Sequence, residues 1–158
     1  MIIKLIEKVQ LTVGVIALSV FLIAILIQVF ARYFGIPVIW TEEVANYSFI
    51  WAVFMGASVM LNRRQHFKFD LFSQKLKGKS RTYLNIFNDS ILLIFNLAIF
   101  YYGIITVKNF WNYNWVSLPM IKMGYVWISI PIMGLTMSIY TLGHMMCSIK
   151  ELKGKEVK

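Results

Sequence analysis

The stretch that decides the fold is residues 40–70, WTEEVANYSFIWAVFMGASVMLNRRQHFKFD. It holds an apolar run of one helix length, from Val44 to Leu61, between the acids Glu42 and Glu43 and a basic segment that begins at Arg63. A helix of roughly 20 apolar residues crosses the hydrocarbon core of a bilayer, which is about 30 Å thick. Acids at one end and bases at the other give such a span a fixed direction. We therefore interpret the stretch as a transmembrane helix with a defined orientation.

The composition of the whole chain is that of an integral membrane protein. Of its 158 residues, 59% are hydrophobic and 15% are charged, which is more apolar side chain than a soluble domain of this size can bury. The single cysteine, Cys147, rules out an internal disulfide and any C-x-x-C arrangement. The sequence also has no glycine-rich phosphate loop, no Gly-x-Ser-x-Gly elbow and no His-Glu-x-x-His motif. We therefore expect no enzyme, no catalytic or metal site and no resident cofactor.

Four segments of the chain are long and apolar enough to cross a membrane. They are residues 9–31, 41–61, 83–107 and 125–148. The predicted fold is thus an all-α integral membrane protein, with the four transmembrane helices in a single domain over residues 1–158.

Lysine and arginine residues predict the orientation of these helices. The N-terminal flank, the connection between the second and third spans, and the C-terminal tail carry 2, 7 and 4 of them. Only Arg32, Lys108 and Lys122 fall on the opposite side. Because basic loops stay in the cytoplasm, both termini are predicted to face it. The net charge of +9 lies in short segments between apolar runs, so the expected partner of this charge is anionic lipid, not nucleic acid.

The connection between the second and third spans predicts a short amphipathic helix over about residues 67–81. Apolar side chains recur there at helical spacing, and lysines lie largely on the other side, which is typical of a helix in the headgroup plane. The side chains expected to anchor it to the inner leaflet are Phe69, Phe72, Lys75, Leu76 and Lys79.

The outer end of the second span carries polar residues with local roles. Thr41 can cap the helix, and Glu42 and Glu43 lie in its first turn, where the helix dipole favours acids. Arg32, at the end of the first span, is expected to pair with one of these acids. Together they would form an outer polar clamp.

Two stripes of small residues predict close helix packing. Ser48, Ala52 and Gly56 recur every four residues in the second span, and Gly134 and Ser138 repeat the pattern in the fourth. Small side chains let helix backbones approach closely in lipid, where little hydrophobic force drives helices together. The partner helices can belong to this chain or to a larger subunit.

Asp89 is the one acid in the interior of an apolar span, away from its ends. A carboxylate at the middle of a membrane helix costs about 2.5 to 3.5 kcal/mol, so it is a functional candidate by default. We favour structural pairing with Arg63, Arg64 or Lys68, because ion coupling by a single shallow acid needs further liganding groups that the chain lacks. The alternative is a small autonomous oligomeric transporter or channel with Asp89 or Glu43 in a shared pore.

The polar residues around the second span, taken together, resemble a family pattern. In order they are Arg32, Trp40-x-Glu42-Glu43, Gly56-Ala57 and Arg63-x-x-His66-x-x-x-Asp70. This order is similar to that in the small membrane subunit of tripartite ATP-independent periplasmic (TRAP) transporters, the DctQ-like family. The resemblance extends over nearly the whole chain in length, number of spans and topology.

The resemblance implies a function that the amino-acid composition alone does not indicate. Such a chain would be the scaffold, or stator, of a bacterial inner-membrane secondary transporter that imports an organic acid such as a dicarboxylate, a keto acid or sialic acid. A large membrane subunit would hold the sodium and substrate sites, and a periplasmic protein would capture the substrate. Arg32, Lys108 and Lys122 are the candidates for docking that protein, since they are the only cations facing it.

Overall fold

The structure is a computed structural model that describes residues 2–63 and 79–156. Within these ranges four helical stretches are long and apolar enough to cross a membrane, which confirms the all-α prediction with four spans. The helices are α1 (Ile2–Tyr33), α2 (Trp40–Asn62), α4 (Lys79–Phe110), α5 (Gly124–Trp127) and α6 (Ser129–Glu156).

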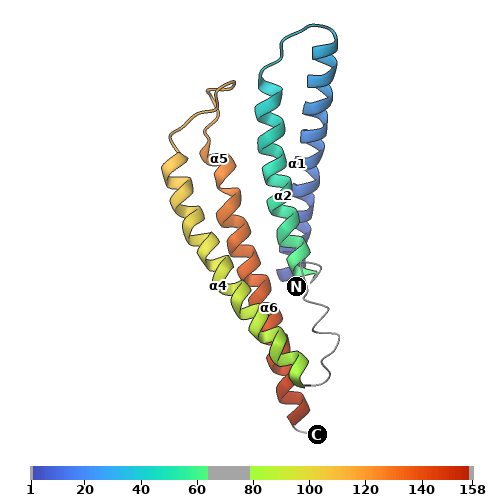
Figure 1. The fold of residues 1–158 in the computed structure, drawn as a ribbon, viewed down its shortest axis with the longest axis vertical. Coiled ribbons are helices and arrows are strands. Elements are labelled where there is room, and N and C mark those ends of the chain that lie inside the picture. Colours follow the sequence, from blue (N-terminus) through green and yellow to red (C-terminus); the bar gives the residue numbers. More distant parts are fainter. Residues whose placement is uncertain (1, 64–78, 157–158) are drawn as a thin grey trace.

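The helices form two hairpins that stand side by side (Figure 1). One hairpin is α1 and α2; the other is α4 with α5 and α6, and α2 meets α6 at the contact between the hairpins. The enclosed part of the molecule lies around α5 and α6, where 50% of the most apolar window is buried, against 6% in α1. Both chain ends lie away from the connections 34–39 and 111–123 (Figure 1).

A small apolar core joins the two hairpins. Leu61 of α2 packs with Met133, Met137 and Tyr140 of α6, and all four are buried. The core is small because membrane helices direct much of their apolar surface to lipid, so van der Waals packing and hydrogen bonds must hold the helices together.

The predicted fourth span, residues 125–148, is interrupted near its start. The helix divides at Ile128 into α5 and α6. Pro131 has no N–H to donate to the carbonyl of Trp127, one turn earlier, so the regular hydrogen-bond ladder is broken there. At the same junction the Ser129 hydroxyl donates to the Val126 carbonyl at 2.6 Å.

The other helices extend beyond the predicted spans. The spans 9–31 and 83–107 lie inside α1 and α4, and 41–61 inside α2, because polar flanks continue each helix past the hydrocarbon core. Residues 79–81, assigned to the end of an interfacial helix, instead begin α4. The rest of that predicted segment, with Phe69, Phe72, Lys75 and Leu76, lies outside the described residues, and so do His66 and Asp70 of the family pattern.

Candidate functional site

Glu43 ties the N-terminal end of α2 to the connection between α4 and α5. Its two carboxylate oxygens accept the backbone N–H groups of Val116 at 2.8 Å and Ser117 at 2.7 Å. Hydrogen bonds to an ionised carboxylate are shorter and stronger than those between neutral groups. We call this contact the Glu43 clamp; it joins the two helical hairpins at the end that carries the connections 34–39 and 111–123.

The connection held by Glu43 is itself ordered by backbone hydrogen bonds. Asn114 and Lys122 form an antiparallel β-bridge, and the Trp115 N–H donates to the Ile121 carbonyl at 3.0 Å. The loop therefore presents two consecutive N–H groups to one carboxylate in a fixed geometry.

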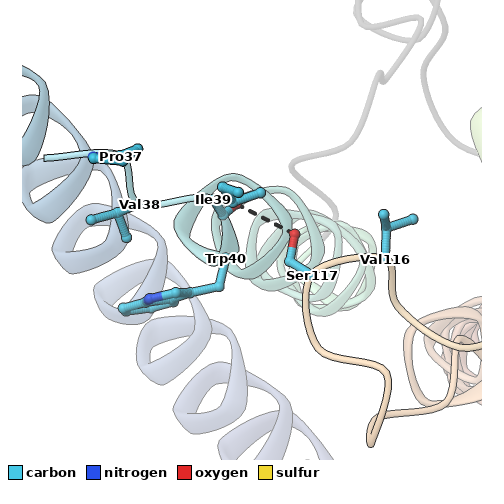
Figure 2. A pocket seen from close by; sticks show the side chains of 6 residues that line it. All are labelled: Pro37, Val38, Ile39, Trp40, Val116 and Ser117. Atoms are coloured by element: carbon cyan, nitrogen blue, oxygen red, sulfur yellow. Dashed lines mark hydrogen bonds between the residues drawn. The ribbon is translucent and has the colours of Figure 1, made fainter.

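A second contact lies beside the clamp. The Ser117 hydroxyl is 3.5 Å from the carbonyl oxygen of Ile39, which immediately precedes α2 (Figure 2). The contact borders a hollow of about 520 Å³ whose lining includes Pro37, Trp40 and Val116. Trp40 of the family pattern therefore lies close to the clamp.

Aromatic side chains strengthen the same end of the molecule. The Trp51 indole N–H donates to the Tyr125 carbonyl at 3.1 Å. The Tyr47 and Trp115 rings meet edge to face, with 4.5 Å between their centroids. Both contacts join α2 to the second hairpin, and both use aromatic residues of the type enriched at membrane interfaces.

The predicted outer clamp is corrected in two respects. Within the described residues no ion pair joins Arg32 to Glu42 or Glu43, because the oxygens of Glu43 are taken by backbone amides. Thr41 does not cap α2: its hydroxyl donates to the Val38 carbonyl at 3.2 Å, and no side chain caps the helix.

The end of α1 explains where Arg32 lies. The N–H of Gly35 donates to the Arg32 carbonyl at 3.1 Å, and that of Ile36 to the Ala31 carbonyl at 2.8 Å. With Gly35 at a φ of 69°, this is a Schellman motif, which needs a left-handed residue just after the helix. The turn places Arg32 beside a hollow of about 420 Å³, whose lining also includes Glu42.

Toward the chain termini, four side chains form a buried hydrogen-bonded network, which we call the polar ladder. Gln10 donates through Nε2 to the Thr136 hydroxyl at 2.8 Å and accepts from the Tyr140 hydroxyl at 2.6 Å. The Thr136 hydroxyl also lies 3.4 Å from that of Ser58. Gln10, Ser58 and Tyr140 are no more than 4% exposed. The ladder thus links α1, α2 and α6 in the interior of the helical bundle.

One helical turn nearer the termini, a second polar group continues these contacts. Glu7 accepts hydrogen bonds from the Arg63 guanidinium and the Asn62 amide, each at 2.7 Å. The His144 ring nitrogen Nε2 lies 3.1 Å from the Asn62 carbonyl oxygen. Glu7 lies three positions before Gln10, and His144 lies four positions after Tyr140. Asn62 and Arg63 lie four and five positions after Ser58.

Sequence reasoning missed Glu7 and Gln10, although a signal was present. They are polar residues three apart at the start of an apolar helix, and so share one face of it. Thr136, Tyr140 and His144 recur every four residues in the fourth span in the same way. Two matching polar stripes on different helices are the pattern that would have identified the ladder.

The small-residue stripe of the fourth span lies at a close contact with α4. A Cβ atom added to Gly134 would stand 2.7 Å from the backbone nitrogen of Phe100. Ser138 is buried, and its hydroxyl donates to the Gly134 carbonyl at 2.7 Å. Next to this contact, the Asn96 amide lies 3.4 Å from the Thr141 hydroxyl.

The stripe in the second span behaves differently. A Cβ atom added to Gly56 would meet nothing within 4 Å. Gly56 and Ala52 instead line an apolar groove of about 270 Å³ between α1 and α2. The close approach of those two helices occurs at Gly14, where an added Cβ would stand 3.4 Å from that of Met55. Ser48 donates to its own helix, at the Val44 carbonyl.

The remaining predicted residues are spread over the molecule. Asp89 is half-buried in α4, and Arg63, one of its three expected partners, forms an ion pair with Glu7. The pairing of Asp89 stays a prediction, because the other two lie outside the described residues. Lys108 is exposed, and the Lys122 ammonium stands 5.9 Å from the centre of the Trp111 ring, a cation–π distance.

Four long apolar helices joined by buried polar contacts define a multi-span membrane protein. Residues 8–151 match the family model of the tripartite ATP-independent periplasmic transporters, DctQ component. The chain therefore belongs to the DctQ family of TRAP transporter small permease subunits, as the residue pattern had predicted. The family consists of transporter subunits and not of enzymes.

Two relatives from Haemophilus influenzae illustrate the family. A provisionally named TRAP transporter small permease protein of strain ATCC 51907 / DSM 11121 / KW20 / Rd is 26% identical over 142 residues, which are 89% of this chain and 88% of that protein. The sialic acid TRAP transporter permease protein SiaT of strain 86-028NP is 23% identical over 129 residues, which are 78% of this chain. The match covers only 20% of the length of SiaT.

Proposed function

We propose that this chain is the stator of a TRAP-type secondary transporter in the bacterial inner membrane. It braces the fixed part of a large membrane subunit, which holds the sodium and substrate sites. A periplasmic binding protein delivers an organic acid, and the sodium gradient drives its import. The family match, which names the DctQ component, is the starting point for this proposal.

The observation that carries the stator role is the double fastening of the two helical hairpins. The Glu43 clamp joins them at the outer end, and the polar ladder around Gln10 joins them toward the termini. Directed hydrogen bonds specify one arrangement of helices, whereas lipid-like packing alone leaves helices free to slide. A body fastened at both ends suits a subunit that stays fixed while its partner moves.

The surface of the first hairpin supports the presence of a membrane partner. Only 6% of the most apolar window of α1 is buried within the chain. Beside α1 runs the apolar groove that contains Gly56, which residues 2–63 and 79–156 leave open. A helix of the large subunit could approach closely there, because a glycine leaves the backbone uncovered.

The relatives support the kind of partner and substrate. SiaT is named a permease protein of a sialic acid TRAP transporter, and this chain corresponds to about a fifth of it. A separate large permease subunit would then supply the rest of the machinery. Sialic acid, a dicarboxylate or a keto acid is the proposed substrate class.

Charge supports two further contacts. On the outer side Arg32, Lys108 and Lys122 are the proposed docking cations for the periplasmic protein. Lys4 and Lys8 flank the first span on the other side, where anionic headgroups of the inner leaflet are the proposed partner.

The test of the stator role is copurification followed by uptake. A tagged chain, extracted from native membranes in mild detergent, should bring a larger membrane subunit with it. Reconstituted with that subunit and the periplasmic protein, it should support organic-acid uptake that depends on an inward sodium gradient. A matched control replaces the sodium gradient with potassium at equal ionic strength.

Two results would contradict the proposal. The first is persistence of full uptake in cells that lack this chain. The second is transport by the chain alone in liposomes, which would favour an autonomous oligomeric transporter using Asp89 or Glu43.

A further inference from the structure

The outer hollow between α1 and α2 presents charges of both signs to one space. Its lining includes Gln28 and Arg32 from the end of α1, Glu42 from the start of α2, and residues 35–39 that connect them. Its volume of about 420 Å³ is in the range of small-ligand sites. The left-handed turn at Gly35 brings the two helix ends to this common space.

The two charges of the hollow do not satisfy each other. Among residues 2–63 and 79–156, neither Arg32 nor Glu42 takes part in an ion pair, and both side chains are exposed. The neighbouring Glu43, by contrast, uses both of its oxygens in the clamp. A cation and an anion that face one hollow without joining are complementary to a ligand that carries both signs.

The surroundings of the hollow favour a lipid over a soluble ligand. The hollow lies at the ends of two membrane spans, which is the level of the phospholipid headgroups. Ile36 and Ile39, which line it, are 58% and 73% exposed. A phospholipid could place its headgroup in the hollow and its acyl chains along this apolar face, whereas a soluble ligand would leave the face uncovered.

We propose that this hollow binds the headgroup of a zwitterionic phospholipid with a primary ammonium, namely phosphatidylethanolamine. The Arg32 guanidinium and the Gln28 amide donate to the phosphate, and the Glu42 carboxylate accepts from the ammonium. With Arg32 engaged by lipid, docking of the periplasmic protein rests on Lys108 and Lys122. A planar guanidinium matches the oxygens of a phosphate with two parallel hydrogen bonds. The quaternary ammonium of phosphatidylcholine has no N–H to donate, and phosphatidylglycerol has no cation for Glu42.

The test measures which lipids the purified chain retains. The full-length chain is washed free of lipid in detergent and incubated with equal amounts of phosphatidylethanolamine, phosphatidylcholine and phosphatidylglycerol. It is then repurified, and the retained lipid is counted by mass spectrometry. Size-exclusion profiles check that each variant is folded, which is expected because the substituted side chains are exposed.

Wild-type protein should retain phosphatidylethanolamine over the other two lipids by about tenfold. Arg32→Ala should lower its retention by about tenfold. Glu42→Gln should abolish the preference over phosphatidylglycerol while phosphate binding remains. Lys108→Ala removes a cation on the same side but outside the hollow, so its retention profile should equal that of wild type.

Three outcomes would overturn the proposal. They are equal retention of the three lipids by wild type, a preference for phosphatidylglycerol, and an effect of Lys108→Ala as large as that of Arg32→Ala. A parallel pull-down distinguishes a protein ligand: loss of the large subunit from Arg32→Ala with unchanged lipid retention would make the hollow a subunit contact. The lipid proposal depends on the membrane-spanning fold and not on the stator role. Its failure would therefore not contradict the stator role.

Discussion

Glu42 and Glu43 are adjacent acids with different surroundings. Glu43 accepts two backbone N–H groups of the second hairpin, while Glu42 is exposed beside the outer hollow. Successive residues of a helix point about 100° apart, so only one of the two can face the neighbouring hairpin. At the residue scale the clamp therefore depends on a single side chain.

Replacing Glu43 with Gln should loosen the end of the molecule that carries the connections 34–39 and 111–123. One carboxylate oxygen becomes an NH₂ group that cannot accept, and the charge that strengthens the other bond is lost. We expect a loss of about 1.5 to 3 kcal/mol in the free energy of unfolding, measured by denaturant titration in lipid-free detergent. Glu42→Gln removes the same charge one residue away and should change the free energy of unfolding by less than about 0.5 kcal/mol. Equal effects of the two substitutions would show that net charge, and not the clamp, is responsible.

Asp89 gives a second prediction at this scale. If its carboxylate serves structural pairing, Asp89→Asn should leave sodium-driven uptake by the assembled transporter largely intact, because the amide keeps the shape and one acceptor oxygen. Initial uptake rates with matched amounts of assembled complex provide the measurement. Normal assembly combined with abolished uptake would indicate ion coupling instead.

At the scale of secondary-structure elements, α6 is the helix on which the others converge. It packs against α4 at Gly134, which has no side chain. Its Thr136 and Tyr140 form hydrogen bonds with Gln10 of α1. Close packing and hydrogen bonds are both needed, because the association of apolar helix surfaces in lipid gains little free energy from the hydrophobic effect. The element therefore carries glycine on one face and hydrogen-bonding groups on another.

Gln10→Leu should destabilise the chain by removing both of its ladder contacts. The Tyr140 hydroxyl loses its acceptor in a buried site, at a cost of about 1 to 3 kcal/mol. In a double-mutant cycle with Tyr140→Phe, unfolding in mixed micelles should give a coupling energy of about 0.6 to 1.7 kcal/mol. Ser19→Ala, on an exposed part of the same helix, removes only a bond to its own backbone and serves as the control. Zero coupling would mean that the two side chains do not act together.

The two glycine stripes should respond in opposite ways to added bulk. Gly134→Ala places a Cβ against the backbone of Phe100 and should cost about 1 to 3 kcal/mol of chain stability. Gly56→Leu has open space within the chain, so folding should persist while recovery of the large subunit in a pull-down falls. Monodisperse yield and copurified subunit are measured side by side for both variants. Unchanged recovery with Gly56→Leu would show that this groove faces lipid.

At the scale of the whole molecule, the two hairpins are fastened near both ends and expose much of their apolar surface. The connections 34–39 and 111–123 lie at one end of the bundle, away from the chain termini (Figure 1). The predicted orientation puts these connections in the periplasm and the termini in the cytoplasm.

Cysteine labelling tests this orientation in intact cells. In a Cys147→Ser background, Met120→Cys should react with a membrane-impermeant maleimide from outside, since Met120 is 99% exposed on the outer connection. Lys4→Cys, at the other end, should react only after the membrane is opened. The reverse pattern would invert the orientation and move the proposed lipid site to the inner leaflet.

The sequence by itself determined the class of protein, its four spans and its family. Those properties follow from local quantities: the length of each apolar run and a pattern of residues close together in the chain. Helix ends were less predictable, because polar flanks continue α1 and α4 past the predicted spans, and the last span, which contains the helix breaker Pro131, divides into α5 and α6.

Only the tertiary structure decided which polar groups meet. Glu43 binds the amides of Val116 and Ser117 instead of Arg32, and Gln10 meets Tyr140, 130 positions away. Such pairs depend on how the helices are rotated against one another, which apolar periodicity leaves open when nearly every face is apolar. In lipid a buried hydrogen-bonding group must find a partner, and the bundle geometry determines which partner is within reach.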